Sequence, residues 1–337
     1  MNRFLSSEYS VGLRFHSYYL SMNNSSVKLF AGPDSLDDHN IDELYKIAEI
    51  KADGEPAIYG ARTVGLKSRT NFDHANSDKG FMGYDFEAVM QNFNIFGHGG
   101  NADDLTPLPT VQMAGKLYRD TGLIGSSEIM LPAIQLACIK KSFATDPFLV
   151  WNSAVDQLGW HIRQMAGFAQ EHGWMVGLKN GKWLGEEYKT AEHEAFKGKT
   201  SIEIVWDGLV DYASIAPETI LIQRGCDLPA KGEYRNLPIH YTARRTKLRH
   251  CSKNLSLFFD PSHSLGPKMR DKIVEKTVEA MRMKLDDDHY LYDGILIEVG
   301  TAKCDTHQHI TIDELQQLVD ELSSFRTLAN RRAQAAV

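Results

Sequence analysis

Positively charged side chains follow several short apolar segments along this chain. Arg62 lies within one such segment, Lys67 and Arg69 follow it, and Lys179 and Arg224 each follow another. Arginine binds phosphate and carboxylate oxygens through paired N–H groups, and lysine supplies a point charge. Any one of these residues alone reads as an ordinary surface charge. Together, in a chain of net charge -7, they predict a binding site for a small polyanion.

A second set combines carboxylates with an imidazole: Asp34, His263, Glu298 and Asp305. Such a set suits a hard or borderline divalent ion, with Mn²⁺ or Mg²⁺ favoured because oxygen ligands dominate. The alternative is that these are hydrogen-bonded loop carboxylates without an ion.

The most informative segment of the chain is 257–266. Three apolar residues stop at Asp260, and Pro261, Ser262 and His263 follow before a helical pattern from Lys268 to Met283. A buried strand that ends in this way presents its polar residues at the carboxyl end, where catalytic groups project in parallel α/β proteins.

Eight apolar segments read as strands, and a helical pattern follows each of them. They are Val27–Ala31, Ala57–Leu66, Leu123–Ile129, Phe148–Trp151, Met175–Leu178, Thr219–Ile222, Leu255–Phe259 and Gly294–Val299. Asn40, with Glu43 three residues on, predicts a capping box at the first helix. Eight repeats favour a (β/α)8 TIM barrel over a doubly wound sheet. The glycines at 97, 99 and 100 lack dinucleotide-binding spacing.

Composition indicates an ordinary globular protein, with 42% hydrophobic and 24% charged residues among 337. We expect an N-terminal extension at residues 1–26, a single barrel domain at 27–330, and a homodimer or homotetramer. The pI of about 6 predicts neither a nucleic-acid nor a membrane surface. Four dispersed cysteines and the lack of a recognisable signal peptide predict a cytoplasmic location.

Several short motifs, in this order, resemble one family. They are Ala31-Gly32-Pro33, Arg62 with Lys67-Ser68-Arg69-Thr70, Gly177-Leu178-Lys179-Asn180-Gly181, Gln223-Arg224-Gly225, Asp260-Pro261-Ser262-His263 and Glu298 with Asp305. The chain from about Val27 to Leu322 resembles the 3-deoxy-7-phosphoheptulonate synthases and 3-deoxy-manno-octulosonate 8-phosphate synthases, which are (β/α)8 barrels.

This resemblance implies that phosphoenolpyruvate condenses with an aldose phosphate, with erythrose 4-phosphate as the expected acceptor. It implies catalytic roles for Lys67 and His263, and metal binding by Asp34, His263, Glu298 and Asp305. Substrate binding would fall to Arg62, Lys67, Arg69, Thr70, Lys179 and Arg224. The segment 72–76 instead resembles the octulosonate enzymes, which keeps arabinose 5-phosphate as an alternative acceptor.

The chain departs from the family pattern at four places. Asp34 stands where the family has a metal-binding cysteine, and Ser68 replaces a proline. The segment 152–156, after the fourth strand, lacks the family's phosphate-binding arginine. The spacing from Glu298 to Asp305 is also shorter. A non-catalytic barrel that binds a phosphorylated metabolite is therefore the alternative from a different functional class.

Overall fold

Eight parallel strands close into a barrel in the computed structural model, which describes residues 26–67, 82–182, 196–226, 239–253, 255–304 and 306–329. The strand order is β10-β9-β8-β7-β6-β5-β4-β1, and β1 also pairs with β10, which closes the ring. The barrel strands are β1 (Ser26–Gly32), β4 (Gly60–Arg62), β5 (Ile124–Ile129), β6 (Phe148–Asn152), β7 (Met175–Lys179), β8 (Glu218–Gln223), β9 (Leu255–Phe259) and β10 (Gly294–Glu298). The predicted (β/α)8 TIM barrel is confirmed.

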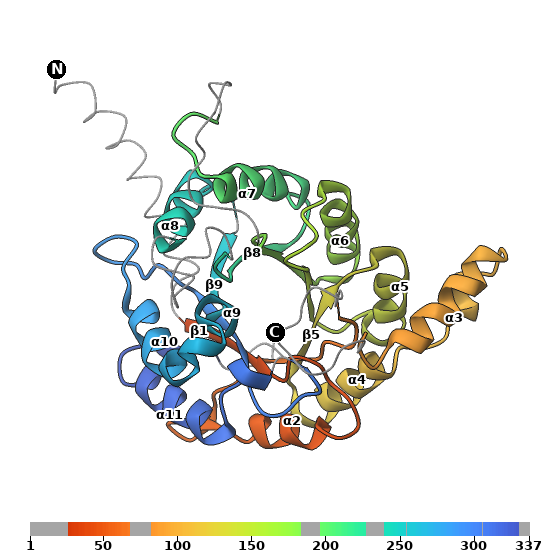
Figure 1. Ribbon diagram of the computed structural model, residues 1–337, viewed down its shortest axis with the longest axis horizontal. Coiled ribbons are helices and arrows are strands. Elements are labelled where there is room, and N and C mark those ends of the chain that lie inside the picture. Colours follow the sequence, from red (N-terminus) through yellow and green to blue (C-terminus); the bar gives the residue numbers. More distant parts are fainter. Residues whose placement is uncertain are drawn as a thin grey trace.

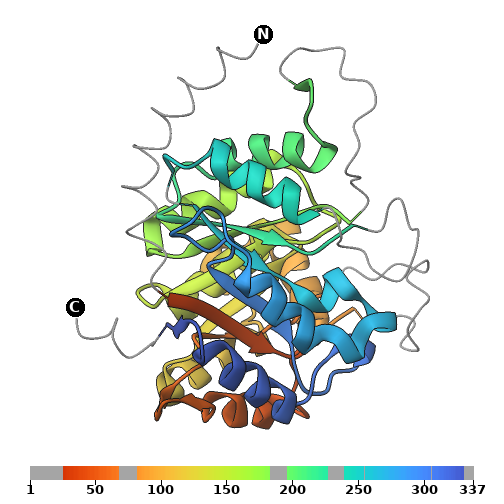
Figure 2. The ribbon, with the colours of Figure 1, turned by 90° about the vertical axis from the view of Figure 1, so that its left-hand side faces the viewer.

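Helices surround the strands on the outside, as Figure 1 shows along the barrel and Figure 2 shows from the side. They are α2 (Ile41–Ala48), α3 (Phe86–Gly97), α4 (Pro109–Thr121), α5 (Pro132–Phe143), α6 (Gly159–His172), α7 (Ser201–Tyr212), α8 (Ile239–Arg249), α10 (Ile273–Arg282) and α11 (Ile312–Ser323). The short helix α9 (Pro261–Leu265) lies inward of α10, directly after β9 (Figure 1). Short 3₁₀ turns lie at η1 (Ala102–Asp104), η3 (Pro267–Lys272) and η4 (Thr306–Gln308). None of the helices within the described ranges is long and apolar enough to cross a membrane.

Two small elements were not predicted from the sequence. Strands β2 (Lys51–Ala52) and β3 (Glu55–Pro56) form an antiparallel hairpin, and β11 (Thr327–Leu328) pairs with the start of β1. The predicted helix from Lys268 to Met283 is wrong at its start, because the regular helix α10 begins only at Ile273. The predicted N-terminal extension, apart from Ser26, lies outside the described residues and stays a prediction.

The predicted capping box at α2 does not form. The helix begins after Asn40, but the Asn40 side chain donates to the carbonyl oxygens of Ser35 and Thr301, at 2.9 and 2.8 Å. Glu43 accepts from the backbone N–H of Thr301 at 2.7 Å and from its hydroxyl at 3.0 Å. These polar groups therefore join the loop after β1 to the loop after β10, which is a tertiary use that local spacing does not reveal.

Large and small residues alternate between neighbouring strands in the barrel interior. Phe30 of β1 lies opposite Gly60 of β4, and Phe258 of β9 lies opposite Gly294 of β10. The two phenylalanine rings contact each other with their centroids 6.0 Å apart. The glycines thus leave the space that the two rings fill, and the barrel has a packed interior.

We predict that Gly60→Ala destabilises the fold by about 1–3 kcal/mol through overpacking. An added Cβ would lie 2.2 Å from a Phe30 ring carbon and 2.8 Å from the Ile124 carbonyl oxygen, which is backbone. The matched control is Gly208→Ala in α7, where nothing lies within 4 Å, and a gain of up to about 1 kcal/mol is expected. Urea unfolding measures both, and equal stabilities would contradict the packing argument.

Candidate functional site

The predicted site residues that the structure describes lie at the carboxyl ends of the barrel strands. Asp34 follows β1, Arg62 ends β4, Lys179 ends β7, and Glu298 ends β10. Lys67 follows β4, Arg224 follows β8, and His263 lies in α9 directly after β9. The predicted residues Arg69, Thr70 and Asp305 lie outside the described residues.

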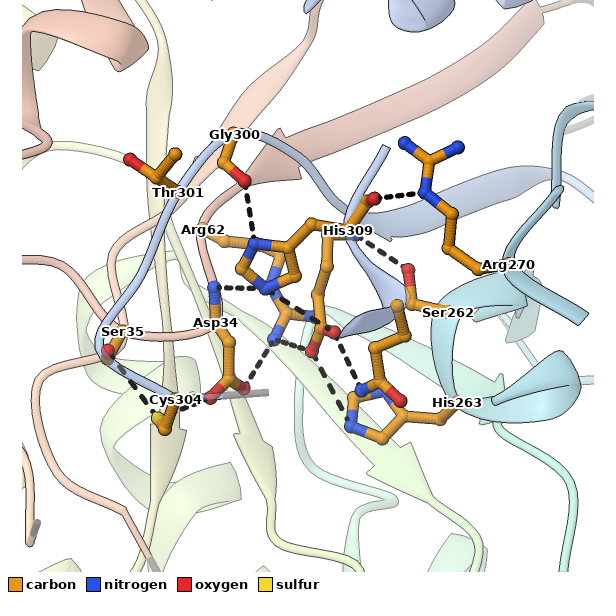
Figure 3. A network of polar contacts seen from close by, with 12 residues as sticks. Asp34, Ser35, Arg62, Ser262, His263, Arg270, Gly300, Thr301, Cys304 and His309 are labelled. Atoms are coloured by element: carbon orange, nitrogen blue, oxygen red, sulfur yellow. Dashed lines mark hydrogen bonds and ion pairs between the residues drawn. The ribbon is translucent and has the colours of Figure 1, made fainter. Parts of the chain in front are cut away.

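Asp34, His263 and Glu298 form a cluster that could hold a metal ion. One ligand atom from each lies within 4.8 Å of the others. Asp34 and Glu298 are fully buried, and 16% of the His263 side chain is exposed. Two carboxylates and one imidazole, converging from the carboxyl ends of three separate strands, fit a divalent ion of the Mn²⁺ or Mg²⁺ type. Figure 3 shows Asp34 and His263 on opposite sides of this cluster.

The backbone around β1 brings Asp34 to this position. A Cβ on Gly32 would lie 2.9 Å from the carbonyl oxygen of Arg62, so only glycine allows the two strand ends to approach so closely. At the opposite side, Asp260 caps α9 by accepting from the backbone N–H of His263, and Pro261 occupies the first turn. The Asp-Pro-Ser-His segment thereby fixes the imidazole relative to the end of β9.

Asp260 holds two of the predicted site residues at once. Its Oδ2 lies 2.9 Å from Nδ1 of His263 and 3.1 Å from Nζ of Lys179. Burial lowers the pKa of His263 to about 3, although Asp260 opposes this, while Lys179 and Arg224 reinforce it. The imidazole is therefore neutral near neutral pH, which is the state that binds a metal ion.

Cations neutralise the carboxylates of the cluster. Lys67 Nζ lies 2.5 Å from Asp34 Oδ1, and Arg62 Nη2 lies 3.1 Å from Glu298 Oε1 and 3.8 Å from Asp34 Oδ1. Burial raises the pKa of Asp34, but the charges of Lys67 and Arg62 outweigh burial and hold it well below its usual range. The buried carboxylates and the buried cations are thus in direct contact with each other. The residues that could bind a metal ion and those that could bind an anion therefore form one site.

Arg62 has unused hydrogen-bonding capacity. Its side chain is 2% exposed, and its guanidinium lies 5.8 Å from the centre of the Trp151 ring. Its Nε and Nη1 donate no hydrogen bond to any residue in the described ranges. A buried donor without an acceptor is costly, by about 1–3 kcal/mol or more for a charged group. An anionic ligand would satisfy these two donors.

Sequence reasoning missed three residues that support the cluster. Gln308 donates to Glu298 Oε2 at 2.8 Å. His309 donates from Nδ1 to the Gly300 carbonyl at 2.9 Å and accepts the backbone N–H of Asp34 on Nε2 at 3.3 Å. Asp260 was recognised as a strand end but was not assigned to the site. The polar run at 306–309, after the last strand, was the available signal for the other two residues.

Asn152 stands where the family resemblance leads one to expect a phosphate-binding arginine nearby. Its side chain accepts from the Lys179 N–H at 2.8 Å and donates to the carbonyls of Lys179 and Asp156, at 3.1 and 2.6 Å. Asn152 therefore ties the end of β6 to the end of β7. It is already used within the chain and does not replace an arginine.

Comparisons with known proteins support the fold. No protein-family model matches this chain, and no curated protein matches it significantly. Among solved structures, the chain is similar to the crystal structure of phospho-2-dehydro-3-deoxyheptonate aldolase (DAHP synthase) from Thermotoga maritima. The TM-score is 0.59 and the identity 15%, over 89% of this chain and 69% of that one. At this identity the likeness shows a shared (β/α)8 barrel and no more.

We predict that Asp260→Asn destabilises the protein by about 3–5 kcal/mol, because the buried Lys179 loses its countercharge. Burial raises the pKa of Asp260, but His263 and Lys179 lower it further, so the net pKa lies below the usual range. The stability from Asp260 is therefore complete above about pH 4 and is lost as the pH falls below that value. The variant should consequently show a weaker loss of stability in acid.

The control is Asp211→Asn, which breaks the ion pair between Asp211 and Lys253. The Asp211 side chain is 75% exposed and the Lys253 side chain is 36% exposed. A change of about 1 kcal/mol or less is expected there. Urea unfolding as a function of pH measures both variants. Equal effects of the two substitutions would show that the Asp260 pair is not a structural ion pair.

Proposed function

We propose that this protein is a synthase that condenses phosphoenolpyruvate with an aldose phosphate, giving a 3-deoxy-2-ulosonate phosphate and inorganic phosphate. The observation that carries the proposal is the buried Arg62, whose Nε and Nη1 have no partner among the described residues, beside the Asp34–His263–Glu298 cluster. The likeness of fold to a DAHP synthase supports the reaction class and makes erythrose 4-phosphate the proposed acceptor.

The cations of the site would bind the two anionic substrates. Arg62 is held in place by Glu298 and Trp151, so its two remaining N–H groups are oriented before an anion arrives. Arg224 is 4% exposed, and the N–H of its backbone donates to Asn180 at 2.8 Å. Fixed donors of this kind offset the repulsion between two phosphorylated molecules without reorganisation during the reaction.

A divalent ion fits the same site. Asp34, His263 and Glu298 would hold it, with Asp305 as a further proposed ligand, and Mn²⁺ or Mg²⁺ suits the oxygen donors. Such an ion would supply Lewis-acid polarisation of the acceptor's aldehyde. Neutral His263 is ready to bind it without first losing a proton.

The bond changes balance without a further reactant besides water. The enol carbon of phosphoenolpyruvate bonds to the aldehyde carbon, water adds to the cation left at the neighbouring carbon, and the phosphate group leaves. Lys67 is the proposed proton donor to the aldehyde oxygen as that oxygen gains charge. Its side chain is 10% exposed, and its Nζ donates a hydrogen bond to Asp34 Oδ1 at 2.5 Å, so the donor is positioned beside the cluster.

Two observations favour the non-catalytic alternative. Lys67 and Lys179 are paired within the chain with Asp34 and Asp260, and Asn152 occupies the end of the fourth barrel strand. A barrel with fewer available cations could bind a phosphorylated metabolite without turning it over. An octulosonate-type synthase that uses arabinose 5-phosphate differs only in the acceptor.

We predict that the full chain with Mn²⁺ releases phosphate from phosphoenolpyruvate only when an aldose phosphate is present. Phosphate is measured with erythrose 4-phosphate, arabinose 5-phosphate and ribose 5-phosphate as acceptors. Release with arabinose 5-phosphate alone would identify the octulosonate-type reaction. Binding of phosphoenolpyruvate without release, for every acceptor, would establish the non-catalytic alternative.

Arg62→Lys tests whether the two Arg62 donors that lack partners among the described residues bind phosphoenolpyruvate. Losing a buried contact to a charged ligand should weaken phosphoenolpyruvate binding by about 2–5 kcal/mol, which is about 30-fold or more. The matched control is Arg163→Lys on the exposed surface of α6, which should leave binding unchanged. Equal affinities in calorimetry would exclude Arg62 from the substrate site.

We predict that His263→Ala weakens Mn²⁺ binding by about 100-fold or more while the fold is retained. Loss of outer contacts to metal ligands already costs about 10–100-fold, and a direct ligand contributes more. His98→Ala, at an exposed position, is the control. Calorimetry measures the affinity, and an unchanged value in His263→Ala would place the ion elsewhere.

A further inference from the structure

Cys304 places a thiol against the candidate metal cluster from the loop after β10. Its Sγ lies 2.9 Å from Oδ2 of Asp34 and 3.6 Å from the hydroxyl of Ser35. The residue is 3% exposed, and Figure 3 shows the sulfur directed at Asp34 and Ser35. The sequence did not indicate this contact, since 270 positions separate the two residues.

The loop that carries Cys304 is fastened to the loop that carries Asp34. Thr301 is bonded through its backbone to both Asn40 and Glu43. Lys303, directly before the cysteine, pairs with Asp37 at 3.0 Å. These contacts at Thr301 and Lys303, directly before the cysteine, therefore hold the thiol beside Asp34.

The two oxygens of Asp34 have different neighbours. Oδ1 contacts Lys67, whereas Oδ2 contacts the Cys304 thiol. Neighbouring ligands of a four-coordinate ion with bonds of about 2.0–2.3 Å lie on the order of 3–4 Å apart. The present 2.9 Å is close to that range, so a small displacement would let one ion contact both atoms. The buried Arg62, with two donors lacking partners among the described residues, faces the same cluster.

We propose that Cys304 is a thiolate ligand of the divalent ion, bound together with Asp34, His263 and Glu298. The inference rests on the proposed function of the cluster as a metal site and specifies its ligands. On binding, a sulfur–metal bond forms and the thiol proton leaves to solvent. A sulfur ligand shifts the preference of the site from Mg²⁺ toward softer or borderline ions such as Co²⁺, Zn²⁺ and Cd²⁺.

The test is titration of the full, reduced chain with Co²⁺, followed by absorption spectroscopy. Visible d–d bands report that cobalt is bound, and a near-ultraviolet sulfur-to-cobalt charge-transfer band reports a thiolate ligand. We expect both in the native protein. Cys304→Ser should lose the near-ultraviolet band and keep the visible bands. It should also weaken Cd²⁺ binding by about tenfold or more, and should weaken Mg²⁺ binding far less, because Mg²⁺ prefers oxygen ligands.

Cys226→Ser and Cys251→Ser are the matched controls, and both should keep the near-ultraviolet band. Urea unfolding of each variant checks that the fold is retained. Cobalt binding without the near-ultraviolet band, or a band that persists in Cys304→Ser, would overturn the role of Cys304 and leave the proposed metal site standing. The absence of any cobalt binding would overturn both.

Discussion

Mutual neutralisation of buried charges at the carboxyl ends of the strands is the constraint on which this structure depends. Asp34, Asp260 and Glu298 are fully buried, and each contacts a cation that is itself 10% exposed or less. Removing one member would leave a bare charge in a medium of low dielectric constant, where it is far more expensive than in water. Because the partners come from different strands, the charges tie neighbouring parts of the barrel to one another.

The pairing of these buried charges also limits how an anionic ligand can bind, because the cations already have carboxylate partners. Under the proposed function, a substrate phosphate that approached Lys67 would compete with Asp34, and one that approached Lys179 would compete with Asp260. A divalent ion bound by Asp34 and Glu298 would withdraw negative charge from Lys67 and Arg62. Those cations would then interact more strongly with an anionic substrate. If the proposed function holds, metal and substrate binding should reinforce each other, which is a coupling that two separate sites would lack.

The sequence predicted the barrel because strand and helix patterns alternate locally, and local periodicity survives into the fold. It also placed Lys179, His263 and Glu298 at strand ends, and the topology brought them together. Roles that depend on distant partners were not predictable. Asn40 and Glu43 have the spacing of a capping box yet bind Thr301, and Cys304 contacts a residue at the other end of the chain. Asn152 likewise serves the backbone of the next strand, a use that its residue type leaves undetermined.

The start of α2 has a consequence for how this protein can change over evolutionary time. Its polar groups hold the loop of Thr301, so that helix and loop behave as one mechanical unit around Asp34. A substitution at Asn40 would release the loop of Thr301 and so disturb the position of Asp34 in the cluster. Asn40 has this effect although none of the contacts described above joins it directly to the cluster. Sequence drift in the outer ring of helices is thus restrained at positions 40 and 43 by the structure of the interior, whereas position 301 is held mainly through its backbone and is freer to vary.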